Sequence, residues 1–169
     1  CPGDIYTITV TINPAPILAD LSITVCSDII SGLNLAIAGG SIPAATYNIT
    51  NINDNGLTAS GGSPATGTGF AADVIANDAW NNITNASVNV LYTVVPVAAG
   101  GCQGNAKDVT ITVNPEPVIT PGQNPSVCSN VALDYKILLD NFDNPGDNVT
   151  FTYPLPTIDP NISGGNARP

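Results

Sequence analysis

The chain of 169 residues is long enough for one or two domains, and its net charge of −10 argues against binding to nucleic acid or to anionic membranes. It has no histidine and no CxxC pair, so it lacks the usual residues of a zinc site, a redox site or a His-based catalytic triad. Its 15 prolines and 16 glycines fall between apolar stretches, which predicts an all-β protein of short strands and turns. The shortage of general bases predicts that it is not an enzyme.

The chain begins with a segment in which apolar and polar residues alternate. Ile8, Val10 and Ile12 are separated by threonines, which predicts a strand with one buried apolar face. An Asn-Pro-x-Pro motif follows directly. Because proline has no N–H to donate, the motif should end the strand and form a stiff interdomain joint. The residues assigned to this joint are Asn13, Pro14 and Pro16.

Several later segments also have the composition of strands. Two further segments alternate clearly: Val88 to Val94, which ends near Pro96, and Val109 to Val113, where apolar residues alternate with Thr110 and Thr112. Residues 70–80 could form one helical turn, but no segment has a convincing helical pattern. The shorter strands are expected at 22–26, 33–38, 45–50, 71–76, 131–139 and 148–153.

The chain repeats part of its own sequence. Residues 102–119 match residues 1–18 at seven of eighteen positions with an offset of 101, and residues 127–130 match residues 25–28 with an offset of 102. Such a small drift in the offset is what loop insertions leave in a duplicated module. The identical pairs are Cys1/Cys102, Gly3/Gly104, Thr9/Thr110, Thr11/Thr112, Asn13/Asn114, Pro14/Pro115 and Pro16/Pro117.

A period of this length fits whole sandwich domains laid end to end, because solenoid repeats are shorter. We expect residues 1–14 to be the last strand of a preceding repeat and residues 15–116 to form a complete β-sandwich repeat. Residues 117–169 would then form the N-terminal half of the next repeat. The second copy of the motif supplies the next joint, at Asn114, Pro115 and Pro117.

The four cysteines predict structural disulfides in a compartment outside the cytosol. We expect Cys26 to pair with Cys102, since one lies in the first strand of the complete repeat and the other lies in the turn before its last strand. In a seven-stranded sandwich these two places should meet at the same end. Cys1 and Cys128 would then stay unpaired within this chain, with partners outside it.

Calcium is the one cofactor that the sequence suggests. Asp140, Asp143 and Asp147 lie in one loop, and Asp54 lies in an Asn-Asp-Asn-Gly stretch, so carboxylates and amides could supply oxygen ligands. Neither loop has the spacing of an EF-hand. The alternative, which stays open, is that these residues only shape turns.

Six segments, taken in order, resemble a known family of repeats. They are residues 25–27, 46–47, 82–85, 91–96, 101–104 and 109–115. Together they resemble the PKD-like repeats of giant Bacteroidota cell-surface proteins, which the type IX secretion system exports and which include gliding-motility adhesins. The resemblance implies tandem immunoglobulin-like β-sandwich repeats with a spacer or adhesive role. Many such repeats have a Tyr-x-Trp strand, whereas the single tryptophan of this chain lies elsewhere, at Trp80.

These features together predict a non-catalytic structural segment of a large extracellular adhesin on a bacterial cell surface, forming a stalk or filament for adhesion or gliding motility. Its expected partners are neighbouring repeats of the same polypeptide and, at the surface, glycans or proteins. No apolar run is long enough to insert into a membrane. The alternative is an accessory glycan- or protein-binding module of a secreted multidomain enzyme. We expect Tyr47, Trp80 and Tyr92 in the core, which gives a sugar-stacking platform little support.

Overall fold

The computed structural model describes residues 1–140 and 150–152 of the chain. The chain divides into two compact units, of which the first unit is Cys1–Val118 and the second unit is Ile119–Pro169. The described residues form strands and turns, and none of them forms a helix that could cross a membrane. The predicted all-β class is confirmed.

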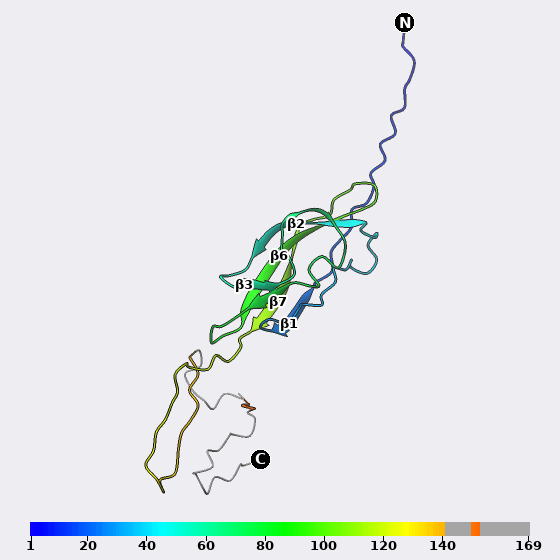
Figure 1. The fold of residues 1–169 in the computed structure, drawn as a ribbon. Coiled ribbons are helices and arrows are strands. Elements are labelled where there is room, and N and C mark those ends of the chain that lie inside the picture. The colour runs from blue at the N-terminus through cyan, green and yellow to red at the C-terminus, as the bar shows by residue number, and fades with distance from the viewer. Residues whose placement is uncertain (141–149, 153–169) are drawn as a thin grey trace. The chain divides into compact units, whose positions relative to one another are not determined.

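Seven strands of the first unit form two sheets (Figure 1). The larger sheet has five strands in the order β1-β7-β6-β2-β4, and β3 pairs with β5 in a separate sheet. Neighbouring strands are antiparallel except for β1 and β7, which are parallel. The strands are β1 (Ser22–Cys26), β2 (Thr46–Asn53), β3 (Thr58–Gly61), β4 (Gly67–Phe70), β5 (Ala79–Asn81), β6 (Val88–Val97) and β7 (Lys107–Asn114).

The centre of the larger sheet is the antiparallel pair β6 and β7, whose inward side chains are fully buried. Val90 lies opposite Ile111, and Tyr92 lies opposite Val109. All four side chains are 0% exposed, whereas the residues between them are half-buried or exposed. The alternation predicted for both segments is confirmed, because every second side chain of these strands points into the core.

The core continues from β6 and β7 into the second sheet and its connecting segments. Trp80 of β5, together with Leu57 and Ile75 from the connections, belongs to the same buried cluster. Tyr47, Trp80 and Tyr92 are 6%, 4% and 0% exposed, so their predicted place in the core is confirmed. These three rings therefore offer no exposed stacking surface.

The parallel pairing of β1 with β7 decides where the chain enters and leaves the sandwich. Ser22 lies beside Thr110, and Cys26 lies beside Asn114. Since β1 follows the incoming segment and β7 precedes the outgoing one, the chain enters at one end of these strands and leaves at the other (Figure 1).

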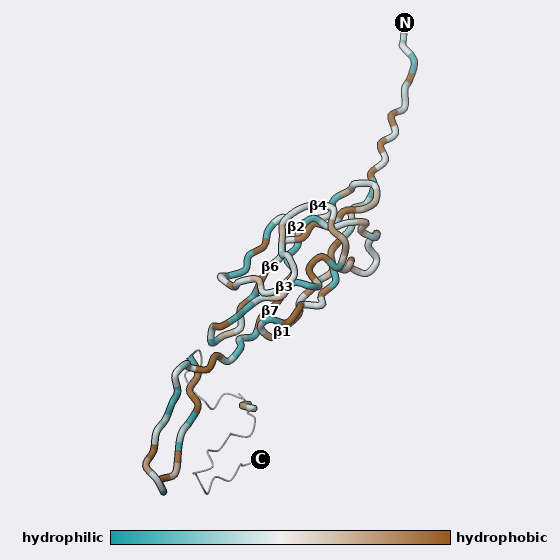
Figure 2. The backbone as a smooth tube through the Cα atoms, in the orientation of Figure 1, coloured by the Kyte–Doolittle hydropathy of each residue, from teal (hydrophilic) through white to brown (hydrophobic). Residues whose placement is uncertain are grey.

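Residues 1–14 are exposed and belong to neither sheet. Ile8, Val10 and Ile12 are 87%, 78% and 88% exposed. Figure 2 shows hydrophobic and more polar positions alternating along the N-terminal segment. Their counterparts in the sequence repeat are the buried, inward-facing residues of β7. The segment has the pattern of a strand, but a strand also needs a hydrogen-bonded neighbour. Its assignment to a preceding repeat stays a prediction.

Three of the shorter predicted strands were wrong. Residues 71–76 lie in a turn segment that is closed by backbone hydrogen bonds. Residues 33–38 and 131–139 each contain one isolated bridge instead of a strand. Apolar composition alone misled the prediction, since these residues meet the core or a neighbour without forming a continuous ladder. Of the segment 148–153, residues 150–152 are described and form no strand, and the other half lies outside the described residues.

The described part of the second unit begins with the same backbone contacts as the sandwich of the first unit. Equivalent residues are 101 or 102 positions apart, as in the sequence repeat. The matching contacts are the antiparallel bridges Leu18–Ile37 and Ile119–Leu139, and the N–H to carbonyl hydrogen bonds from Ala19 to Ala36 (2.9 Å) and from Thr120 to Leu138 (3.0 Å).

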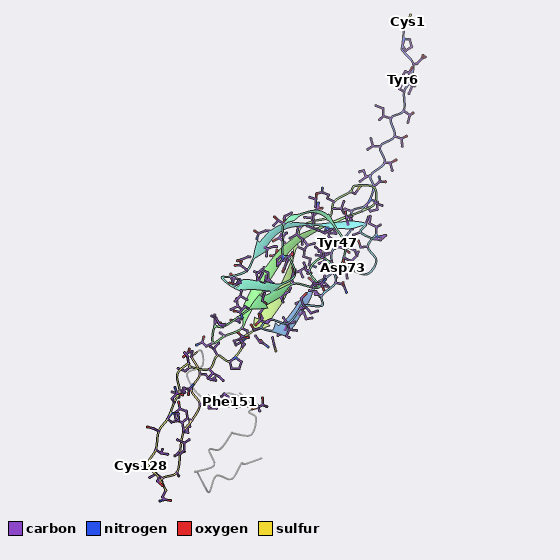
Figure 3. All side chains as sticks on the ribbon, viewed as in Figure 1. Cys1, Tyr6, Tyr47, Asp73, Cys128 and Phe151 are labelled. Atoms are coloured by element: carbon purple, nitrogen blue, oxygen red, sulfur yellow. The ribbon has the colours of Figure 1, made fainter. Side chains whose placement is uncertain are left out.

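The turn after the cysteine also recurs in the two units. The N–H three residues beyond the cysteine donates to that cysteine's carbonyl at 3.2 Å after both Cys26 and Cys128 (Cys128 is labelled in Figure 3). Asp28 and Asn130, two residues after these cysteines, have positive φ angles of 62° and 65°. None of the described residues of the second unit is buried, in contrast to the closed core of the first unit.

Candidate functional site

The described residues contain no group of three or more His, Cys, Asp or Glu side chains that could hold a metal ion. The carboxylate of Asp54 accepts the N–H of Gly56 at 2.9 Å, so this residue shapes the turn between β2 and β3. Asp140 is exposed, and Asp143 and Asp147 lie outside the described residues. Calcium binding by that loop therefore stays one of two alternatives, and the other is that its residues only shape a turn.

The strongest candidates for function lie where the chain enters and leaves the sandwich. We define the entry end by Pro16, Leu18, Gly104 and Lys107. Pro16 and Leu18 are buried, and the ammonium group of Lys107 donates to the Leu18 carbonyl at 3.2 Å. Lys107 also pairs with the exposed Asp20 at 2.6 Å, but an ion pair so open to water contributes little. Burial and the hydrogen bond therefore fix the incoming chain, and Pro16 belongs to the sandwich.

Gly104 makes the closest contact of the entry end, because a Cβ atom at this position would collide with the carbonyl oxygen of Pro16. We expect Gly104→Ala to lower the free energy of unfolding by about 1–3 kcal/mol, since the buried Pro16 has no room to move away. Gly100→Ala is the matched control, because a Cβ there meets no atom within 4 Å. Urea unfolding measures both variants, and equal stabilities would contradict the tight contact.

We define the exit end by Ser27, Asn82, Asn114 and Glu116. Asn82 is 0% exposed, and its Nδ2 donates to the Val113 carbonyl at 2.8 Å. Its backbone N–H donates to the Ser27 hydroxyl at 2.8 Å, and its backbone carbonyl accepts the N–H of Glu116 at 3.0 Å. One buried asparagine therefore joins the residue after β1, the C-terminal end of strand β7 and the departing chain.

The second Asn-Pro-x-Pro motif ends its strand as predicted. β7 ends at Asn114, directly before Pro115, and the Asn114 carbonyl accepts the N–H of Ser27 at 2.9 Å. Pro117 is exposed, in contrast to the buried Pro16 of the first copy. The role of the motif as a joint between repeats stays a prediction.

Asp28, and Glu116 of the exit end, accept hydrogen bonds from the same side-chain amide. Nδ2 of Asn81 donates to Asp28 at 3.1 Å and to Glu116 at 3.2 Å. Hydrogen bonds from Ser60 and then from Asn81 hold the pKa of Asp28 below its ordinary value. Because Asp28 is exposed, these contacts position the loop more than they stabilise the fold.

Asp78 is a carboxyl group inside the core. It is 3% exposed, and the hydroxyl of Tyr92 donates to its Oδ2 at 2.7 Å. Burial raises the pKa of Asp78, and hydrogen bonds from Tyr92 and from the backbone of Ser63 offset this only in part. Burial and then the neighbouring carboxylate also raise the pKa of Tyr92, so its hydroxyl remains the donor.

The raised pKa of Asp78 predicts a pH dependence of stability. The folded protein binds this proton more tightly than the unfolded chain does, so the contribution is fully present below the unfolded pKa and is lost as pH rises through the folded pKa. We expect the stability of the wild type relative to Asp78→Asn to increase as pH is lowered from neutral toward 4. Unfolding in urea at several pH values measures this difference, and a difference that does not change with pH would contradict it.

The predicted disulfide between Cys26 and Cys102 does not form in the structure, where all four cysteines are free. Cys26 lies beside Asn114 at the end of β7, while Cys102 precedes Lys107 at its start. Lys107 and Asn114 alone are about 23 Å apart at the usual rise of a strand. The Cα atoms of a disulfide lie within about 7 Å, so the geometry excludes this pair. The prediction failed because it placed the two cysteines at the same end of the sandwich.

Sequence reasoning missed Asn82, Gly104 and Asp78. Gly104 carried a signal, since the Cys-x-Gly sequence recurs at both ends of the 101-residue repeat. Asn82 lies in residues 82–85, one of the six segments that carry the family resemblance. The burial of Asn82 and of Asp78 had no signal, because the sequence does not distinguish a buried Asn or Asp from one that shapes an exposed turn.

Two packed antiparallel sheets with one parallel strand pair, closed over a shared core, define an immunoglobulin-like β-sandwich. The PKD-like domain family matches residues 23–117, which is more than half of the chain. The chain therefore belongs to the PKD-like domain family, whose members are typically non-catalytic, extracellular structural modules. No curated protein and no solved structure matches the chain.

Proposed function

We propose that the chain is a structural, non-catalytic segment of a giant surface adhesin, in which PKD-like sandwiches follow one another as a stalk or filament. The stalk would serve cell adhesion or gliding motility on a bacterium that exports the adhesin through type IX secretion. Neighbouring repeats of the same polypeptide are then its main partners, and surface glycans or proteins are contacted elsewhere along the adhesin.

The observation that carries this proposal is the recurrence of backbone contacts in the two units. The bridge, the hydrogen bond beside it and the turn after the cysteine all recur at the offsets of the sequence repeat. These contacts support a second copy of the same module. The same backbone hydrogen bonds form in both units although most of the side chains at these positions differ. A tandem array is the simplest arrangement that accounts for them.

The geometry of the complete sandwich also supports a place within an array. The chain enters and leaves at opposite ends, and both ends are fixed by buried residues, Pro16 at entry and Asn82 at exit. Only 9% of residues are charged and the net charge is −10, so copies of the module carry charge of the same sign, which opposes their aggregation. In a stalk, such a module needs only to stay folded and to keep the next repeat attached at its opposite end.

A glycan array probed with native polypeptide that contains at least two complete repeats tests the proposal. We expect no tight binding, because a spacer presents no ligand site. Tight and selective binding would favour the alternative, an accessory module of a secreted enzyme.

The proposal also implies that the sandwich needs no cofactor. We expect melting curves recorded with calcium and with a chelator to coincide for the 169-residue chain. A clear upward shift with calcium would instead indicate that the folded chain binds the ion.

A further inference from the structure

We propose that a disulfide closes each joint between consecutive repeats, formed by the Cys26-type cysteine of one repeat and the Cys102-type cysteine of the repeat that follows it. This inference rests on the tandem arrangement proposed above, and it gives the cysteines a role that the single sandwich cannot give them.

Cys26 lies at the exit end of the sandwich. It is the last residue of β1 and the register partner of Asn114, the last residue of β7. The next residue, Ser27, donates its N–H to the Asn114 carbonyl at 2.9 Å, which holds this turn against the outgoing chain. The cysteine itself is exposed. Its thiol is therefore available at the point where the chain departs toward the next repeat.

Cys102 lies at the entry end, in the turn between β6 and β7. Its carbonyl accepts the N–H of Ala98 at 2.9 Å, which closes the turn. Gly104, two residues later, lies directly against the carbonyl of Pro16 in the incoming chain. Cys102 is partly exposed, and the turn that holds it lies beside the entering segment (Figure 1).

The distances favour a bond across the joint over a bond within one repeat. Within the sandwich, the rigid ladder of β7 separates the two cysteines by more than about 20 Å. Across a joint, the exit end of one repeat and the entry end of the next are separated only by an Asn-Pro-x-Pro motif. From Asn13 to Pro16 that motif spans at most about 10 Å at about 3.1 Å per residue, and one cysteine of the proposed pair belongs to each end of it. A bend at the joint would therefore bring the two Cα atoms within the about 7 Å that a disulfide needs.

Both types of cysteine recur in the sequence, as the proposal requires. Cys1 occupies the position of Cys102, and Cys128 occupies the position of Cys26 with the same turn after it. No pair of the proposed kind occurs within this chain, which is consistent with four free thiols. The position of each cysteine is thus repeated together with the motif that it would bridge.

The bond forms by thiol–disulfide exchange with an oxidised dithiol reagent or a thiol oxidoreductase of the extracytoplasmic compartment. One cysteine thiolate attacks the disulfide of the oxidant and forms a mixed disulfide. The second cysteine then displaces the oxidant as a thiol. One S–S bond forms and one breaks, and the two electrons and two protons of the cysteine thiols pass to the oxidant.

The test inserts a second copy of residues 16–116 after Glu116 of the 169-residue chain, which keeps the Asn-Pro-x-Pro sequence at both joints. The crossed variant retains Cys26 of the first copy and Cys102 of the second copy. The same-repeat variant retains Cys26 and Cys102 of the first copy. All other cysteines are serine in both, so the two proteins differ only in where the second thiol lies.

Both variants are incubated at low protein concentration with oxidised glutathione, and their intact masses are measured. We expect the crossed variant to lose two hydrogen atoms and the same-repeat variant to carry glutathione adducts or free thiols. Closure of the same-repeat variant would overturn the inference. A crossed variant that stays open while both repeats melt as in the parent chain would also overturn it, and would leave the stalk proposal standing.

Discussion

Ile111→Ala is expected to lower the free energy of unfolding by about 2–5 kcal/mol. Ile111 is 0% exposed, lies at the middle of β7 and pairs with Val90 of β6. The substitution removes buried methyl and methylene groups and leaves a cavity. The neighbouring strands β1 and β6 are hydrogen-bonded to β7, so their residues can fill that cavity only in part. Urea or thermal unfolding of the first unit measures the loss.

The matched control is Ile8→Ala, which removes the same atoms from an equivalent strand pattern. Ile8 is 87% exposed, so we expect a change within about 0.5 kcal/mol in this chain. Equal losses for Ile8 and Ile111 would contradict the closed core of the first unit. In a longer polypeptide that completes a preceding repeat, Ile8→Ala should become as costly as Ile111→Ala.

Asn82→Ala is expected to destabilise the sandwich by more than about 2 kcal/mol, because each buried polar group left without a partner costs about 1–3 kcal/mol. Its amide donates to the carbonyls of Val113 and Ala86 at 2.8 and 2.9 Å, and its Oδ1 accepts the hydroxyl of Thr84 at 2.7 Å. The Val113 partner is fully buried and has no access to water after the substitution.

Asn85→Ala is the control for Asn82→Ala, since Asn85 lies in the same loop and is exposed. We expect it to leave the urea midpoint nearly unchanged. If Asn82→Ala behaves like Asn85→Ala, then the buried amide does not hold the exit end together. Amide hydrogen exchange at Glu116 offers a second readout, because its N–H donates to the Asn82 carbonyl.

The strands that sequence alone could predict are those with a strict apolar alternation. β7 alternates β-branched with polar residues, and β6 has an apolar residue at every second position from Val88 to Pro96. From Val90 in β6 and from Val109 in β7, every second residue is buried. β1 and β2 also fall where short strands were expected. A regular period fixes which face is buried, so these elements were predictable from local pattern.

The strands that were missed have no such pattern. β3 (Thr58–Gly61) and β4 (Gly67–Phe70) are short, rich in glycine and threonine, and largely exposed. Only their place at a sheet edge or opposite Trp80 makes them strands, and that place depends on the whole fold. Tertiary context outweighs local propensity at such positions.

The cysteine pairing was unpredictable for a different reason. The sequence places Cys26 in the first strand and Cys102 before the last strand, but it does not state the direction in which the two strands run beside each other. The parallel register of β1 and β7 separates the cysteines, whereas an antiparallel register would have brought them to the same end.

The same parallel register has a mechanical consequence. Tension applied through the incoming and outgoing chain would pull β1 and β7 in opposite directions along their common axis. Their register pairs, from Ser22 with Thr110 to Cys26 with Asn114, would then be sheared together instead of being peeled apart one after another. A module loaded in this way resists stretching because the backbone hydrogen bonds between β1 and β7 must break together. The pairing of the first strand with the last therefore sets the force at which the sandwich opens.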